Sequence, residues 1–149
     1  MIMKQIYLKH LCMMICLITS MNVFAIDKTI DGINYSLDMS FRTATVTGSS
    51  LANIVVPATI ESDGVTYTVT DIGNGAFKNS STIKTIQLSS TITTINSNAF
   101  SGSSLQSLDA GNEGKVKSIR ESAFWNCTSL QYINLGNALV SIFACAFAV

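Results

Sequence analysis

Histidine and cysteine side chains have the widest chemical repertoire in this chain. His10 is its only histidine, and the four cysteines are Cys12, Cys16, Cys127 and Cys145. A Ser-His-Asp triad, a Cys-His pair and a histidine metal site all need an imidazole. His10, Cys12 and Cys16 lie in the first 25 residues, a segment laid out like a cleaved export signal. The exported chain would keep two thiols and no imidazole, so we predict neither catalytic residues nor a metal site.

Paired carboxylates could hydrolyse glycosides if they were held about 5 to 10 Å apart. The candidates are Glu61 with Asp63, which flank a Gly turn, and Glu113 with Glu121, which flank an insertion. We interpret both pairs as solvated loop residues. Three further aspartates could bind Ca²⁺ but lack the dense alternation of calcium loops; they are Asp27, Asp31 and Asp38. No cofactor and no enzymatic activity are predicted.

The first 25 residues have the features of a signal peptide. Lys4 and Lys9 give a positive start, residues 11–18 are apolar, and Val23 and Ala25 are suited to a signal peptidase. A spanning helix needs roughly 20 apolar residues, so this run is too short. We predict cleavage after Ala25, an extracellular or cell-surface location, and no membrane span after cleavage.

The exported chain would carry seven Lys and Arg against nine Asp and Glu, a net charge near −2. It has neither a basic patch nor an acidic block, so no nucleic-acid partner is predicted.

A sequence repeat indicates which strands and turns position any functional side chain. The pair Ala-Phe occurs four times, and the phenylalanines lie 23, 24 and 23 residues apart. An isoleucine precedes each Phe by five residues, and another aliphatic residue lies three residues before that isoleucine. A triplet with the spacing Leu-x-x-Leu-x-Leu follows each of the first three phenylalanines. The phenylalanines are Phe77, Phe100, Phe124 and Phe147; the isoleucines are Ile72, Ile95, Ile119 and Ile142. A fixed period of this length indicates a solenoid.

Each coil is predicted to contain one strand and a short helical turn. In the first coil the strand is centred on Ile86 and Leu88, while Ile72 and Ala76 have the i, i+4 spacing of a turn. The Phe is expected to fill the interior. Residues 69–149 would then form three full coils and a truncated fourth.

Residues 26–68 lack the Ala-Phe repeat and show period-two alternation instead. Residues 33–37 and 44–46 alternate, Pro57 closes a short apolar run, and Asp63-Gly64 is a tight-turn pair. We interpret this segment as a meander of antiparallel strands that caps the array, since repeat arrays need polar-faced ends.

The outward side chains of the repeated strands are the candidate ligand-binding face. They alternate with buried positions, so they are exposed and their variation should cost little stability. Trp125 is a separate candidate, because it follows Phe124 at a position otherwise held by Lys78, Ser101 and Ala148. The predicted strand-face residues are Thr85, Gln87, Ser107, Asp109, Tyr132 and Asn134.

The two remaining cysteines occupy different positions of the repeat. Cys127 replaces Ser80 and Ser103 and is expected to be a small buried residue under the turn. Cys145 is equivalent to Ser122, so it should stack over that residue rather than over Cys127. A disulfide between the two cysteines is disfavoured on geometry.

The unit Ile72-Gly73-Asn74-Gly75-Ala76-Phe77, with the later Cys127 and Leu130, resembles the BspA-type leucine-rich repeat. The segments 31–35 and 44–47 are similar to the strands that precede such arrays. The resemblance implies a β-rich leucine-rich-repeat solenoid on an exported, surface-displayed protein. It also implies adhesion, including binding to host extracellular-matrix proteins of the fibronectin and fibrinogen kind.

We therefore expect a non-enzymatic protein that binds a protein ligand at the cell surface. A carbohydrate-binding module is an alternative, although Tyr132 is the one aromatic platform on the strands. A second alternative is that the chain is a truncated remnant of a longer adhesin and has no independent function. The last residues, 144–149, are wholly apolar, so self-association through an open C-terminal coil is also predicted.

Overall fold

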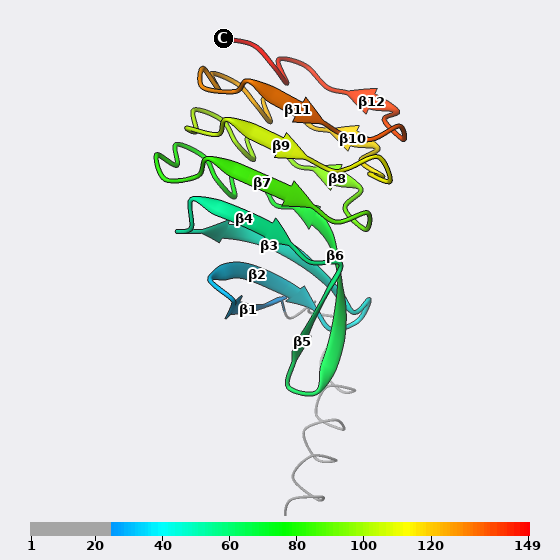
Figure 1. Ribbon diagram of the computed structural model, residues 1–149. Coiled ribbons are helices and arrows are strands. Elements are labelled where there is room, and N and C mark those ends of the chain that lie inside the picture. The colour runs from blue at the N-terminus through cyan, green and yellow to red at the C-terminus, as the bar shows by residue number, and fades with distance from the viewer. Residues whose placement is uncertain (1–24) are drawn as a thin grey trace, which may run out of the picture.

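The computed structural model describes residues 25–149, whose strands stack as successive coils of a solenoid (Figure 1). We name the coils from their first aliphatic residue: coil one is 69–91, coil two 92–115, coil three 116–138 and coil four 139–149. Each full coil gives one strand to each of two sheets, and strands of neighbouring coils pair in parallel. One sheet contains β6 (Val65–Ile72), β8 (Thr94–Ile95), β10 (Ser118–Ile119) and β12 (Ser141–Ile142); the other contains β4 (Asn53–Val56), β7 (Thr85–Leu88), β9 (Ser107–Asp109) and β11 (Tyr132–Asn134). The predicted β-solenoid is confirmed.

The phenylalanines of the Ala-Phe pairs form one continuous stack inside the solenoid. Neighbouring ring centroids lie 5.2, 5.2 and 5.0 Å apart, and neighbouring ring planes are within 9° of parallel. Paired strands lie about 4.8 Å apart, so a residue that recurs once per coil meets its counterpart at stacking distance. Phe77, Phe100 and Phe124 are buried, whereas Phe147 is 43% exposed.

The segment after each short strand is a series of tight turns. In coil one, Ala76 N donates to Gly73 O, Lys78 N to Gly75 O, and Ser80 N to Phe77 O, all three residues back. The predicted helical turn is therefore built from i, i+3 bonds rather than α-helical bonds. Residues in the left-handed region interrupt any helix at two places per coil: Gly75 (φ 61°) and Asn79 (φ 57°) in coil one.

The remaining amides of these turns bond to the next coil. Phe77 N donates to Ala99 O at 2.7 Å, and Phe100 N donates to Ala123 O at 2.8 Å. The turns therefore add a third backbone ladder along the solenoid, and neighbouring coils are joined on three sides.

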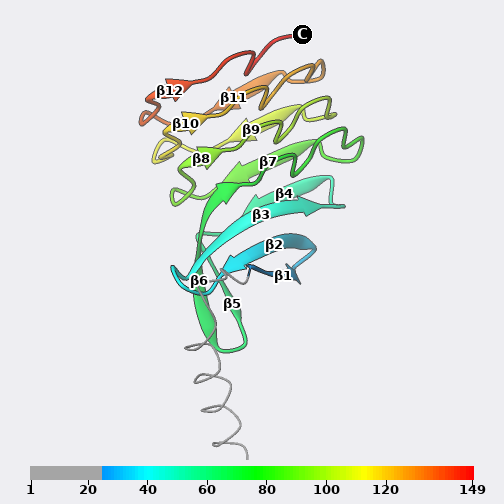
Figure 2. The same cartoon turned by 180° about the vertical axis from the view of Figure 1, so that it is seen from behind.

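The N-terminal segment is only partly a separate cap. As predicted, antiparallel pairing joins β1 (Ala25–Ile30), β2 (Ile33–Asp38) and β3 (Thr43–Ser49), and it also joins β5 (Thr59–Ser62) to β6. However, β3 pairs in parallel with β6, and β4 pairs in parallel with β7. These two strands occupy the place of a preceding coil, because Val46 and Ile54 continue the buried columns of Ile72 and Ile86. Figure 2 shows β3 and β4 stacked beneath coil one.

Coil four packs against coil three and is the most exposed part of the described solenoid. Val140, Ile142 and Phe143 are 82%, 55% and 44% exposed, although the equivalents of Ile142 in coils two and three are fully buried. The predicted leader lies outside the described residues apart from Ala25, which begins β1. Within residues 25–149, no helix has the length and apolar character needed to cross a bilayer.

Candidate functional site

The predicted strand-face residues come together on the outer surface of the sheet that contains β4, β7, β9 and β11. Thr85 lies beside Ser107, which lies beside Tyr132; Gln87, Asp109 and Asn134 align in the same way two residues further on. The intervening Ile86 and Leu108 are buried. The six residues thus form two columns that run along the solenoid, and we call this surface the strand face.

The strand face extends one strand further than the sequence indicated. Asn53 of β4 lies beside Thr85, and Val55 lies beside Gln87. Val55 is 67% exposed, whereas Ile54 and Val56 on either side are buried. Both residues are absent from the predicted face, because residues 53–56 were expected to lie in an antiparallel cap. The available signal was the triplet Leu51-x-x-Ile54-x-Val56, which has the spacing of Ile83-x-x-Ile86-x-Leu88 in coil one.

Side-chain hydrogen bonds hold some residues of each column in fixed positions. Thr85 Oγ1 donates to Asn53 Oδ1 at 2.8 Å. In the other column, Asn134 Nδ2 donates to Asp109 Oδ1 at 2.9 Å, and the same oxygen accepts from Gly111 N at 2.8 Å. Asn134 Oδ1 in turn accepts from Gly136 N at 3.1 Å. These side chains are therefore ordered before any ligand binds, which lowers the entropy cost of recognition.

The strand face carries one carboxylate, and no cation of the described chain neutralises it. Among residues 25–149, the ion pair within 4.0 Å is Lys28 with Asp63, which lies in the N-terminal segment. The closest lysine in sequence to the face, Lys84, donates to Ser81 O at 3.4 Å in the preceding turn. Asp109 therefore has no cationic partner within 4.0 Å among the described residues.

Tyr132 is the exposed aromatic residue of the strand face. Its side chain is 50% exposed and projects from β11, the strand of coil three. An aromatic ring with a phenolic hydroxyl gives apolar contact area together with a hydrogen-bonding group. Tyr132 therefore supplies the largest contact surface on the face.

Trp125 does not join the strand face. It lies in the turn between β10 and β11, and its carbonyl accepts from Gly102 N in the turn ladder at 2.8 Å. Its side chain is 45% exposed. Trp125 is thus an exposed aromatic residue on another side of the coil.

The two described cysteines are free thiols in contrasting environments. Cys127 is buried, and its Sγ donates to Phe100 O at 2.9 Å. Burial raises the pKa of the Cys127 thiol above its usual value, although hydrogen bonds from Ser103 oppose the shift. Cys145 is exposed and has the left-handed backbone (φ 55°) seen at the equivalent Ser122. The two thiols form no disulfide.

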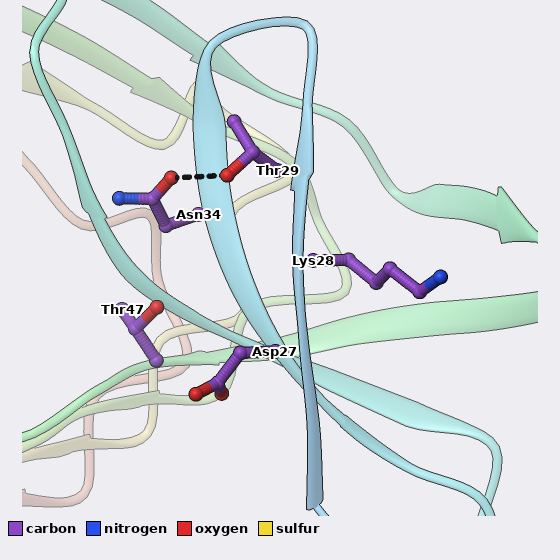
Figure 3. Close-up of a pocket in the computed structure, with 5 residues that line it drawn as sticks. All are labelled: Asp27, Lys28, Thr29, Asn34 and Thr47. Carbon is purple, nitrogen blue, oxygen red and sulfur yellow. Dashed lines mark hydrogen bonds between the residues drawn. The ribbon is translucent and has the colours of Figure 1, made fainter.

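A shallow depression of about 300 Å³ lies on the outer face of β1, β2 and β3 (Figure 3). Within it, Thr29 Oγ1 donates to Asn34 Oδ1 at 2.8 Å. Lys28 extends to the other side of β1, where its ammonium pairs with Asp63 at 3.2 Å. That ion pair and the hydroxyl of Ser62 lower the pKa of Asp63. Among residues 25–149, no three acidic, histidine or cysteine side chains are grouped to hold a metal ion.

Comparison with protein families gives a match over most of the chain. The model of the BspA type leucine rich repeat region, with six copies, matches residues 47–149. This match begins within β3, which agrees with the coil-like position of β3 and β4. Among curated proteins, none matches the sequence.

Solved structures of leucine-rich-repeat proteins share the fold. A leucine rich cell surface protein from Faecalibacterium prausnitzii A2-165 has a TM-score of 0.71 at 28% identity, covering 82% of this chain and 34% of that one. A leucine-rich repeat protein from Bacteroides capillosus has a TM-score of 0.62 at 20% identity, covering 79% of this chain and 97% of that one. The leucine rich repeat protein of T. pallidum has a TM-score of 0.58 at 21% identity, covering 73% of this chain and 50% of that one. The chain thus spans about a third of the F. prausnitzii protein.

Proposed function

Because the chain belongs to the BspA-type leucine-rich-repeat family, we propose that it is an exported, non-enzymatic protein that binds a protein ligand at the cell surface. The similar F. prausnitzii protein is described as a cell surface protein. The observation that carries the proposal is the strand face, where the exposed ring of Tyr132 lies at the end of two polar columns that contain hydrogen-bonded side chains. An aromatic anchor among preorganised polar groups is typical of a protein-binding surface.

The proposed export includes removal of the leader, and the predicted cleavage point lies at the start of the fold. The bond after Ala25 lies within β1, where Ala25 pairs with Asp38 and Ile26 pairs with Leu37. The proposed mature chain, beginning at Ile26, would keep all of β1 except its first residue. Intact-mass measurement of the secreted protein should give the mass of residues 26–149. A secreted protein that retained residues 1–25 would contradict both the leader and the charge argument.

Host extracellular-matrix proteins of the fibronectin and fibrinogen kind are the proposed ligand class. The double variant Tyr132→Ala with Asp109→Ala removes the exposed ring and the one carboxylate of the strand face. We expect it to lose most binding to immobilised fibronectin or fibrinogen while Trp125→Ala binds like the parent. Surface plasmon resonance measures both, with circular dichroism to verify folding. Unchanged binding by the double variant and lost binding by Trp125→Ala would move the site to the turn side of coil three.

A further inference from the structure

We propose that Asp109 and Tyr132 form a subsite for a cationic side chain, best matched by arginine, on the protein partner of the strand face. This inference rests on the proposed function and adds the chemistry of the group that is recognised. The observations behind it are the carboxylate of Asp109, which has no cation within 4.0 Å among the described residues, and the position of Tyr132 on the neighbouring strand.

The carboxylate of Asp109 is held in a fixed orientation, but only one of its two oxygens accepts hydrogen bonds from the described residues. Its Oδ1 accepts from Gly111 N and from Asn134 Nδ2 at 2.8 and 2.9 Å. Two bonds to one oxygen fix the orientation of the group and leave Oδ2 as an acceptor. A charged donor that reaches Oδ2 would form a charge-assisted hydrogen bond without first ordering the carboxylate.

Tyr132 lies diagonally across the sheet from Asp109. Asp109 pairs with Asn134, and Tyr132 is two residues before Asn134 on the same strand. Strand spacing of about 4.8 Å and a rise of about 3.3 Å per residue put the two Cα atoms about 8 Å apart. An extended arginine can span that distance, with its guanidinium at the carboxylate and its stem over the ring, or with the guanidinium stacked on the ring.

The surrounding side chains favour a single cation over a larger charged ligand. The neighbours of the pair are Ser107, Gln87 and Asn134, which are uncharged hydrogen-bonding groups. They can accept the remaining guanidinium N–H groups but would not neutralise a second positive charge. Arginine is also enriched among the residues that dominate binding energy in protein interfaces.

The test measures retention of Nα-acetyl-arginine amide on columns that carry the immobilised secreted protein. Its matched neutral probe is Nα-acetyl-citrulline amide, which has nearly the same shape without the charge. We expect arginine amide to be retained about twofold to fivefold more strongly than citrulline amide, as a single cation contact at an exposed site implies. Raising the salt from about 0.05 M to about 0.5 M should remove most of the difference.

Asp109→Asn is the decisive variant, because an asparagine Oδ1 can still accept from Gly111 N and Asn134 Nδ2. It removes the charge and preserves these bonds, so the preference for arginine amide should disappear while the melting temperature is kept. Tyr132→Ala should weaken retention, and Tyr132→Phe should not. Glu121→Gln, which removes an exposed carboxylate from a turn of coil three, makes the same charge change and should retain arginine amide like the parent.

Equal retention of the two probes, or an Asp109→Asn variant that keeps the preference, would overturn the cation subsite. That result is distinguishable from failure of the proposed function. If matrix binding still depends on Asp109 and Tyr132 together, the strand face is correct and the recognised group is uncharged. If matrix binding is insensitive to both, the face itself is wrong.

Discussion

At the scale of single residues, the repeated phenylalanine has the clearest structural role. Phe100 is fully buried and stacks on both Phe77 and Phe124, each at 5.2 Å. Phe147 has a neighbour on one side only and is 43% exposed. The same side chain therefore makes very different contributions to stability in coils two and four.

Phe100→Ala should lower the free energy of unfolding by about 3–5 kcal/mol, the usual cost of truncating a buried aromatic residue. For a domain of this size that can be most of the stability. Phe147→Ala is the matched control and should cost no more than about 2 kcal/mol, because much of its ring already faces solvent. Thermal unfolding followed by circular dichroism compares the two. Equal losses would contradict the assignment of the interior.

Tyr35 should make the fold sensitive to alkaline pH. Burial, together with the negative charge of Asp31, raises its pKa from 10.0 to about 12. The unfolded chain therefore loses this proton at lower pH than the folded chain. The associated stabilisation is complete below pH 10 and declines as the pH rises toward 12, by about 2–3 kcal/mol in total, since one pKa unit corresponds to about 1.36 kcal/mol.

Tyr35→Phe removes the ionisable group and should flatten this part of the stability profile. Urea unfolding at pH 9 and at pH 11.5, for the parent and the variant, measures the difference. A variant that loses as much stability as the parent over this interval would assign the alkaline sensitivity to other groups.

At the scale of elements, the turns explain where the repeat tolerates substitution. Gly73 packs so closely that an added Cβ would lie 2.8 Å from Val46 O, so glycine is needed where coil one meets β3. The same position holds Asn96, Arg120 and Phe143 in later coils. There the side chains make contacts of their own, as when the Arg120 guanidinium lies 4.8 Å from the centre of the Phe143 ring.

The left-handed turn positions give opposite predictions for two substitutions. Gly75 (φ 61°) has nothing nearer than 3.9 Å to an added Cβ, so Gly75→Ala should lose about 1–2 kcal/mol through backbone conformation alone. Ser122 holds the equivalent position at φ 54°, and Ser122→Gly should raise stability by up to about 1 kcal/mol. Urea unfolding measures both. Changes in the same direction would show that the turn conformation is not the deciding factor.

At the scale of the whole molecule, coil four leaves three ladders open. The outer edges of β11 in coil three and of β12 in coil four lie at the ends of their sheets, as do the amides of the last turn, and the side chains of coil four around them are apolar. An exposed apolar strand edge is a template for pairing with another chain. This surface would suit either a further coil or a second copy of the chain.

We predict that the polypeptide of residues 26–149 self-associates at micromolar concentration. Adding one further coil with a polar outer face should make it monomeric, because the added coil would cover the open ladders. Sedimentation velocity of the two proteins measures the difference. A stable monomer without the added coil would mean that the exposed residues of coil four are covered in another way.

The sequence by itself determined the coil and its interior. An apolar residue that recurs every 23 or 24 positions stacks on its counterparts, so the buried positions of Phe100, Ile95 and Ile119 follow from the period together with the apolar character of these residues. The outward positions of Thr85, Ser107 and Tyr132 follow equally, because alternate residues of a strand face opposite sides.

Only the tertiary structure decided which segments pair with which. From the sequence, residues 53–56 were placed in an antiparallel cap, because a short apolar run specifies a strand but not its partner. The partner of Asn53 is Thr85, 32 residues away, and that long-range pairing adds Asn53 and Val55 to the strand face. Distant pairing also fixes the side-chain hydrogen bonds between coils, such as the one from Asn134 Nδ2 to Asp109 Oδ1. The physical reason is that strand register and side-chain hydrogen bonds are fixed by neighbouring coils, which a local pattern does not encode.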